Sequence, residues 1–227
     1  MDKSIKILAF DTAANACSAA LWAEGEVVAA RHEAMARGQA EALAPMIADL
    51  FGEALLPGDG LGGLDAIAVT VGPGTFTGVR VGLATARALA LPRKLPVIAL
   101  TTIDAICWQT PAVEGPVLVA LETKREDFYV QLFGRDGEVA MAPAAMTVAE
   151  ILPLLPPPPM SIVGDGSGRL EALLAETGRH GSRQLGDVMP VAAEFAALAA
   201  RRFHDGDLGG AEPLYLRPPS VTPPAAK

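Results

Sequence analysis

A strand, a glycine-rich loop and a helix follow one another without a break at residues 64–91, and this succession constrains the fold more than any other part of the sequence. The apolar run D-A-I-A-V-T-V at 65–71 is typical of a buried strand, and the loop G-P-G-T-F-T-G occupies 72–78. Its glycines permit backbone angles that other residues resist, and Thr75 or Thr77 can cap the following helix. Such a helix crosses back over a sheet, so the unit indicates an α/β fold.

The segments around this unit predict one complete lobe over residues 1–100. Three short apolar runs within 5–32 indicate consecutive antiparallel strands. From about Gly38, apolar residues recur at the spacing of one helical face, which predicts a helix over 38–53. A further strand is predicted at 95–100, so the lobe contains a mixed sheet with helical crossovers.

A second, smaller lobe is predicted over residues 101–190. A short helix near 103–108 leads to strands at 116–121 and 128–133, and the strand after the proline tract ends at G-D-G-S-G, residues 164–168. Beyond this lobe, the spacing of Phe195, Leu198 and Ala199 predicts a helix over 191–205 that returns to complete the first lobe. A proline-rich tail covers residues 213–227, and the composition of its last part, 218–227, favours disorder.

Composition argues against several classes of protein. The chain has 227 residues with 18 Lys and Arg against 26 Asp and Glu, a net charge of −8. Bulk electrostatics would therefore repel a nucleic-acid backbone, and any contact with RNA should be indirect or local. Cys17 and Cys107 fit a reducing compartment or two buried thiols better than a disulfide framework. No run is long and apolar enough for a signal peptide or membrane anchor, so we expect a cytoplasmic protein.

Two motifs are candidates for the wall of a nucleotide cleft. D-T-A-x-x-x-C-S at 11–18 resembles the first phosphate loop of the acetate kinase, sugar kinase and actin superfamily, in which an aspartate orients a metal; ordinary turn chemistry is the alternative. Amides at the helix start after 72–78 could hold an anion, or the loop could simply pack that helix against a neighbour. Neither a Walker ending nor a dinucleotide fingerprint is present. The cleft candidates are Asp11, Thr12, Gly72, Gly74, Thr75, Gly164 and Asp165.

Taken together, the motifs resemble those of the TsaB (YeaZ) family. D-T-A, C-S-A-A-L, G-P-G-T-F-T-G-V-R-V-G, V-G-D-G and P-L-Y-L-R at 213–217 occur in that family's order over nearly the whole chain. The resemblance implies an actin-like (ASKHA, ribonuclease H-like) fold of two lobes with mixed sheets and crossover helices. It also implies a paralogue of TsaD, the catalytic subunit of the complex that forms N6-threonylcarbamoyladenosine at position 37 of tRNAs reading codons that begin with adenine.

The resemblance further implies the partners of this chain. The first lobe would bind a TsaD-type catalytic paralogue through the helices at 38–53 and 76–91, and an isolated chain would form a homodimer through similar helices. A TsaE-type ATPase would join the complex, and tRNA would reach the complex rather than this chain. Core packing is the competing explanation for the apolar members of these helices. The interface candidates are Glu41, Met46, Phe76, Thr77, Val79, Arg80, Leu83 and Arg87.

Neither catalytic nor metal-binding residues are expected. TsaD holds a metal with the histidine pair of H-M-E-A-H, and the matching stretch here is T-I-D-A-I at 102–106. The histidines at 32, 180 and 204 lack ligand spacing, and no nucleophile has a readable base beside it. We therefore expect a non-catalytic scaffold without a tightly bound cofactor, to which ATP or ADP could bind only in the assembled complex. The alternative is a small-molecule kinase of the acetate and sugar kinase superfamily that binds ATP between its lobes.

Two stretches depart from the TsaB pattern. G-Q-A-E at 38–41 stands where the family commonly reads H-S-E, which would change a contact with the partner while leaving the helix intact. Glu122-Thr123-Lys124 stands where the family commonly reads D-A-R, and this substitution keeps an acid and a base.

Overall fold

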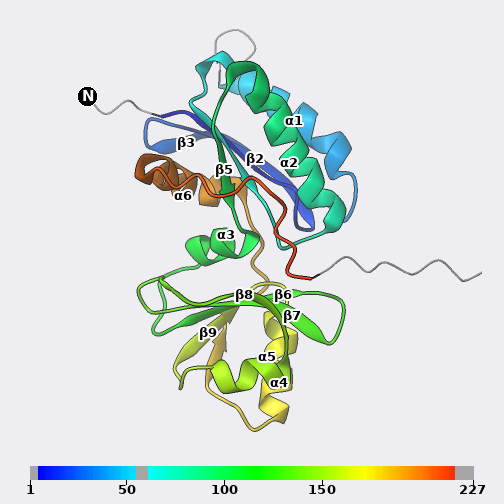
Figure 1. Cartoon of the computed structure of the whole chain (residues 1–227), viewed down its shortest axis with the longest axis vertical. Helices are drawn as coiled ribbons and strands as arrows, with labels where there is room; N and C mark the ends of the chain where they lie inside the picture. The colour runs from blue at the N-terminus through cyan, green and yellow to red at the C-terminus, as the bar shows by residue number, and fades with distance from the viewer. Residues whose placement is uncertain (1–4, 55–60, 218–227) are drawn as a thin grey trace, which may run out of the picture.

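The computed structural model describes residues 5–54 and 61–217, so the part of the expected tail from 218 to 227 lies outside the described residues. The chain forms two lobes stacked along the long axis of the molecule (Figure 1). Each lobe is built on one mixed sheet of five strands. None of the helices in the described part of the chain is long and apolar enough to span a membrane.

The first sheet has the strand order β3-β2-β1-β4-β5. Three antiparallel strands come first in the chain, and they are β1 (Ile7–Asp11), β2 (Ala16–Ala23) and β3 (Glu26–Ala34). Two strands parallel to β1 follow, and they are β4 (Ala66–Thr70) and β5 (Val97–Leu100). Every residue of β1 and β4 is buried, as expected for central strands that are covered on both faces.

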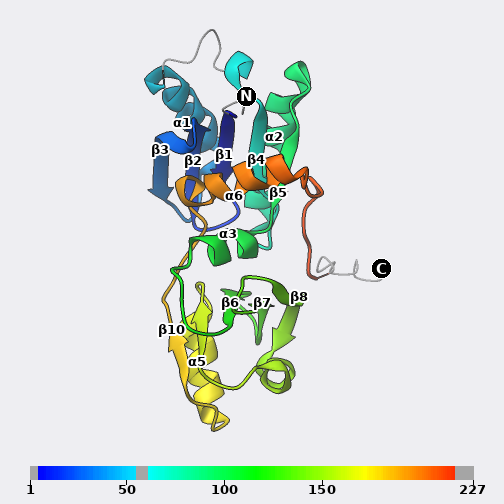
Figure 2. The same cartoon turned by 90° about the vertical axis from the view of Figure 1, so that its left-hand side faces the viewer.

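Helices cover both faces of the first sheet. On one face, α1 (Gln39–Glu53) and α2 (Phe76–Ala90) lie side by side (Figures 1 and 2) and bury apolar residues that include Leu50 and Leu83. On the other face lies α6 (Ala192–Asp205), the helix expected at 191–205, and its fully buried Phe195 packs in a core with Ile7 and Ile98. The first lobe therefore combines an early segment of the chain with a late one.

The second sheet has the strand order β10-β9-β6-β7-β8. Its antiparallel strands are β6 (Val117–Glu122), β7 (Asp127–Phe133) and β8 (Val139–Thr147), and its parallel strands are β9 (Met160–Val163) and β10 (Ser182–Gln184). Three antiparallel strands followed by two parallel ones is also the arrangement of the first sheet. The two lobes thus repeat one topology.

Three helices pack against the second sheet. The short α4 (Val148–Ile151) and α5 (Ser167–Glu176) cover one face around Ile151, Leu170 and Leu174. On the other face, α3 (Thr102–Gln109) lies between the two lobes (Figure 1) and buries Ile103 and Ile106. Single turns of 3-10 helix occur at Leu61–Gly63, Leu91–Arg93 and Leu152–Leu154.

Candidate functional site

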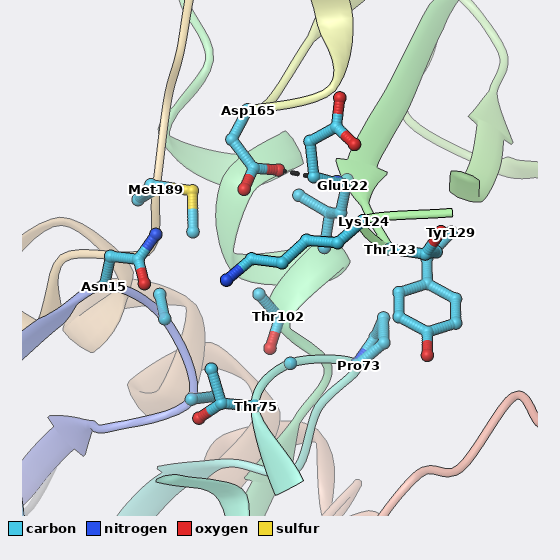
Figure 3. Close-up of a pocket in the computed structure, with 14 residues that line it drawn as sticks. Asn15, Pro73, Thr75, Thr102, Glu122, Thr123, Lys124, Tyr129, Asp165 and Met189 are labelled. Atoms are coloured by element: carbon cyan, nitrogen blue, oxygen red, sulfur yellow. Dashed lines mark hydrogen bonds between the residues drawn. The ribbon is translucent and has the colours of Figure 1, made fainter. Parts of the chain in front are cut away.

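A cleft with a volume of about 230 Å³ lies where the two lobes face each other. Loops of the first lobe form one wall, and the ends of β6 and β9 with the loops that follow them form the other (Figure 3). The first-lobe lining residues are Ala13, Ala14, Asn15, Pro73, Gly74 and Thr75, and Thr102 lines the cleft from the start of α3 between the lobes. Those of the second lobe and of the segment that returns from it are Leu121, Glu122, Thr123, Lys124, Tyr129, Asp165 and Met189.

The glycine loop brings the start of α2 into close contact with the loop after β1. Thr75 caps α2, since its Oγ1 accepts a hydrogen bond from the amide of Gly78 at 3.1 Å, and its own amide donates to the carbonyl of Ala13 at 2.8 Å. A Cβ atom at Gly78 would lie 1.9 Å from the carbonyl oxygen of Thr12, and one at Gly74 would lie 2.4 Å from that of Ala13. Close packing is therefore one requirement that these glycines meet.

Asp11 and Thr12 lie behind the cleft wall rather than on it. Asp11 is fully buried at the end of β1, where its Oδ1 accepts hydrogen bonds from the hydroxyl of Thr70 and, at 3.2 Å, from the amide of Ala13. Burial raises the pKa of Asp11 to about 6, and the hydrogen bonds oppose that shift only in part. The Thr12 hydroxyl donates to the carbonyl of Gly78 at 2.7 Å.

Of the seven cleft candidates, three line the cleft, namely Gly74, Thr75 and Asp165. Gly72 and Gly164 are buried positions with φ values of 99° and 107°, in the region that favours glycine. A Cβ at Gly164 would lie 2.4 Å from the carbonyl oxygen of Ala120, so this glycine permits β6 and the loop after β9 to approach closely.

The second-lobe wall presents three charged side chains. Asp165 Oδ1 accepts a hydrogen bond from the amide of Glu122 at 2.9 Å, and burial raises the pKa of the Asp165 carboxyl above its ordinary value. The Glu122 carboxylate is paired with the guanidinium of Arg169 through two contacts of 2.7 and 2.9 Å. Lys124 extends across the cleft toward Asn15 (Figure 3).

Lys124 is a cleft residue that the sequence interpretation did not place. Its backbone has a φ of 58°, in the left-handed region that non-glycine residues seldom occupy. Such a conformation depends on the surrounding structure, so the sequence carries no local signal for it. The departure E-T-K at 122–124 was visible in the sequence, but its position on the cleft wall was not.

The cleft residues do not fit the metal–nucleotide arrangement that the actin-like superfamily implies. Asp11, the aspartate that would orient a metal, is directed toward Thr70 within the first lobe. Among residues 5–54 and 61–217, no group of three or more His, Cys, Asp or Glu side chains could hold a metal ion. Glu122 is already paired with Arg169. No chemical step is therefore assigned to the cleft.

The interface candidates separate into exposed and buried groups. The exposed ones are Glu41, Phe76, Thr77, Arg80 and Arg87, whereas Met46, Val79 and Leu83 are buried. The buried residues belong to the core between α1, α2 and the first sheet, so the alternative of core packing holds for them in this structure.

Three of the exposed candidates contact the C-terminal segment. The Phe76 ring stacks on Tyr215 with their centroids 5.8 Å apart, and the guanidinium of Arg80 lies 3.4 Å from the Phe76 centroid. Arg80 Nε also donates to the Tyr215 hydroxyl at 2.9 Å, and Arg87 donates to the carbonyl of Ala211. These contacts were not predicted from the sequence, because they join positions more than 100 residues apart.

The positions that match the histidine pair of TsaD lie on α3. Thr102 and Ile106 are buried, and Thr101 caps the helix by accepting from the amide of Asp104 at 2.8 Å. The histidines are on separate elements: His32 on β3, His180 before β10 and His204 on α6, all exposed.

The repeated sheet topology and the cleft between the lobes define an actin-like protein of the ASKHA class. The family model described as TsaD, tRNA N6-adenosine threonylcarbamoyltransferase, matches residues 27–186. The chain is 32% identical to the tRNA threonylcarbamoyladenosine biosynthesis protein TsaB of Escherichia coli (strain K12), over 94% of this chain and 95% of that protein. The chain therefore belongs to the TsaB (YeaZ) family of threonylcarbamoyladenosine biosynthesis proteins, which are paralogues of TsaD.

Two further similarities agree with this family. The solved structure of YeaZ from Pseudomonas aeruginosa superposes with a TM-score of 0.79 at 27% identity, covering 93% of this chain and all of that one. The tRNA N6-adenosine threonylcarbamoyltransferase of Novosphingobium aromaticivorans is 42% identical over 93 residues, which are 39% of this chain and 26% of that protein.

Proposed function

We propose that this chain is a non-catalytic scaffold subunit of the complex that forms N6-threonylcarbamoyladenosine at position 37 of tRNAs reading codons that begin with adenine. Its role is to bind and activate the TsaD-type catalytic paralogue. The observation that carries this proposal is that a threonine and an isoleucine, Thr102 and Ile106, occupy the positions on α3 where the paralogue carries its metal-binding histidines. Both side chains are buried. Neither side chain offers an imidazole ligand.

The proposed interface is the outer surface of α1 and α2. Its exposed members Phe76, Arg80 and Arg87 are of the types that carry much of the binding energy in protein interfaces. Glu41 and Thr77 add polar groups at the starts of the two helices. Because a paralogue offers similar helices, the same surface would join two copies of the isolated chain as a homodimer.

The other partners, an ATPase and tRNA, would bind to the assembled complex rather than to this chain alone. A TsaE-type ATPase would join the assembled subunits, and ATP or ADP would bind only in that assembly. With a net charge of −8 this chain repels the tRNA backbone, so tRNA would contact the complex through the other subunits. The reaction takes place in the cytoplasm, where the complex and its tRNA substrates would meet.

The proposal is tested by reconstituting tRNA modification from purified subunits with and without this chain. We expect little or no modified adenosine when it is omitted, measured by mass spectrometry of digested tRNA. Undiminished product in its absence would end the proposal.

The interface is tested by reversing two charges on α2. The double variant Arg80→Glu, Arg87→Glu should bind the TsaD-type paralogue at least about tenfold more weakly, measured by calorimetry. Arg201→Glu is the matched control, because Arg201 is exposed on α6 across the sheet from α2. Equal affinities for the two variants would place the interface elsewhere.

The kinase alternative is tested on the isolated chain. Titration with ATP and magnesium should release no binding heat, because the described residues include no group of three or more His, Cys, Asp or Glu side chains that could hold the metal. Tight, magnesium-dependent ATP binding by the chain alone would favour the kinase.

A further inference from the structure

The segment Ala211–Arg217, here called the C-terminal strap, is fastened to the first lobe at several points. The amide of Leu214 donates to the carbonyl of Val71 at 2.8 Å, and its side chain packs against the core of the first lobe. Tyr215 stacks on Phe76 and accepts a hydrogen bond from Arg80. The strap therefore holds a defined path along α2 and the end of β4.

At its far end the strap reaches the second lobe. Arg217 forms an ion pair with the carboxylate of Asp127 at the start of β7. Asp127 is only 3% exposed, and within the described chain its Oδ2 has no hydrogen-bond partner apart from this ionic contact. Because a buried carboxylate is costly without a counter-charge, the pair gives Arg217 a fixed anchoring point.

The anchoring point is connected to the cleft wall. The Thr123 hydroxyl lies 2.7 Å from both Oδ1 and the backbone oxygen of Asp127. Thr123 and Lys124 line the cleft, and Lys124 is held with its φ in the left-handed region. A continuous set of contacts thus runs from Arg217 through Asp127 to the loop that carries Lys124.

The strap lies on the opposite side of the molecule from the covalent connections between the lobes. The chain passes from the first lobe to the second through α3, which lies between the lobes, and returns before α6; Figure 2 shows the segment that leaves α3 and the segment that leads to α6 on one side, with the strap on the other. Two lobes joined along one side can open and close about that side. A contact on the other side acts with the greatest leverage on that motion.

We propose that the C-terminal strap closes the side of the molecule opposite the hinge and sets the width of the cleft. Its Arg217–Asp127 contact fixes the second lobe relative to α2 and holds the loop with Thr123 and Lys124 in place. Release of this contact would let the lobes separate. The strap contacts Phe76, Arg80 and Arg87 of the proposed interface, so its effect on the cleft is measured in the isolated chain, without a partner.

The experiment measures the separation of the lobes in the isolated, full-length chain. Spin labels are attached to cysteines placed at the exposed positions Asp49 on α1 and Glu138 in the second lobe, with Cys107 replaced by serine. Cys17 is fully buried and remains unlabelled. We expect a narrow distance distribution in the parent and a broader one with a longer mean in Arg217→Ala.

Three further variants make the result specific. Asp127→Asn removes the charge but keeps an oxygen for Thr123, and it should broaden the distribution as Arg217→Ala does, with no added effect in the double variant. Tyr215→Ala releases the strap at its first-lobe end and should act in the same direction. Arg201→Ala is the control, because its ion pair with Asp205 lies within α6.

Hydrogen exchange reports on the cleft loop in the same variants. Amides of residues 122–127 should exchange about fivefold faster in Arg217→Ala, the change expected for loss of a partly exposed ion pair. Distances and exchange rates identical to those of the parent in both Arg217→Ala and Asp127→Asn would overturn the proposal.

Discussion

Asp11 is a fully buried carboxylate in which only one oxygen is satisfied. Its Oδ1 accepts from Thr70 and Ala13, whereas its Oδ2 has no hydrogen-bond partner among the described residues. Ionisation of such a group in an apolar environment is unfavourable. In this structure Asp11 links β1 to the end of β4 through its hydrogen bond with Thr70.

We expect Asp11→Asn to stabilise the protein at neutral and higher pH. Because burial raises the pKa from 3.8 to about 6, the folded state holds the proton more tightly than the unfolded chain, and the free energy of unfolding falls as pH rises through this range. Asparagine carries no charge and keeps the oxygen that Thr70 and Ala13 contact. The gain should be about 2–3 kcal/mol at pH 8 and vanish below about pH 4.

Urea unfolding between pH 4 and pH 8 measures this difference. Asp49→Asn serves as the matched control on α1, because it makes the same substitution at an exposed position. A stability difference between parent and variant that stays the same at every pH would show that the pKa of Asp11 does not change on folding, and a destabilisation that grows as pH rises would show that Asp11 is an ionised hydrogen-bond acceptor.

At the scale of elements, the position of α2 depends on a glycine that no other residue can replace without movement. Gly78 lies in the first turn of α2, and a Cβ there would overlap the carbonyl oxygen of Thr12. Gly78→Ala should therefore lower the free energy of unfolding by about 3 kcal/mol, since the helix must shift away from the loop after β1.

The control for this prediction is Gly52→Ala on α1. Its added methyl group meets no atom within 4 Å, so the better helix propensity of alanine should raise stability by up to about 1 kcal/mol. Opposite signs in urea unfolding would confirm that packing, rather than helix propensity, decides the outcome at Gly78. Two similar values would contradict the close approach.

The elements that the sequence predicted correctly are those whose own pattern is strong. Continuous apolar runs predicted β4 and β6, and apolar residues spaced along one helical face predicted α1 and α6, so no information on tertiary contacts was required. The bounds of β8 were not predicted, because it is a partly exposed edge strand that contains Pro143. The helix α5 was not predicted, because it begins after the glycine-rich segment and Gly166 offers no side chain that would signal a helix cap.

The cleft was predictable only where it is made of loops that follow strands. Gly74 and Thr75 were proposed from the glycine loop at a helix start, and Asp165 from the G-D-G motif, and all three line the cleft. The conformation of Lys124 and the pairing of Arg217 with Asp127 depend on segments far apart in the chain. No local pattern encodes such contacts.

At the scale of the whole molecule, each lobe has its own apolar cores. Leu170 is fully buried in the second lobe, in a cluster with Phe128 and Ile162, whereas Leu50 is fully buried in the first. We expect Leu170→Ala to lower stability by about 2–5 kcal/mol and to weaken the second lobe selectively. Hydrogen exchange should then lose protection over 117–184 while the first sheet stays protected.

Leu50→Ala is the reciprocal variant and should reverse the pattern. Protection would be lost in the first sheet and in α6, although these segments lie at opposite ends of the sequence. Uniform loss of protection in both variants would show instead that the lobes unfold as one cooperative unit.

The attachment of α6 to the first sheet also dictates an order of events on the ribosome. Phe195, Ala196 and Ala199 complete the apolar layer beneath β1, and they are translated only after the whole second lobe. The nascent second lobe can fold as soon as it leaves the exit tunnel. Until α6 has been translated, one apolar face of the first sheet remains exposed to solvent. The half of the protein that is synthesised first is thus the half that matures last, and it is the half a chaperone would need to shield.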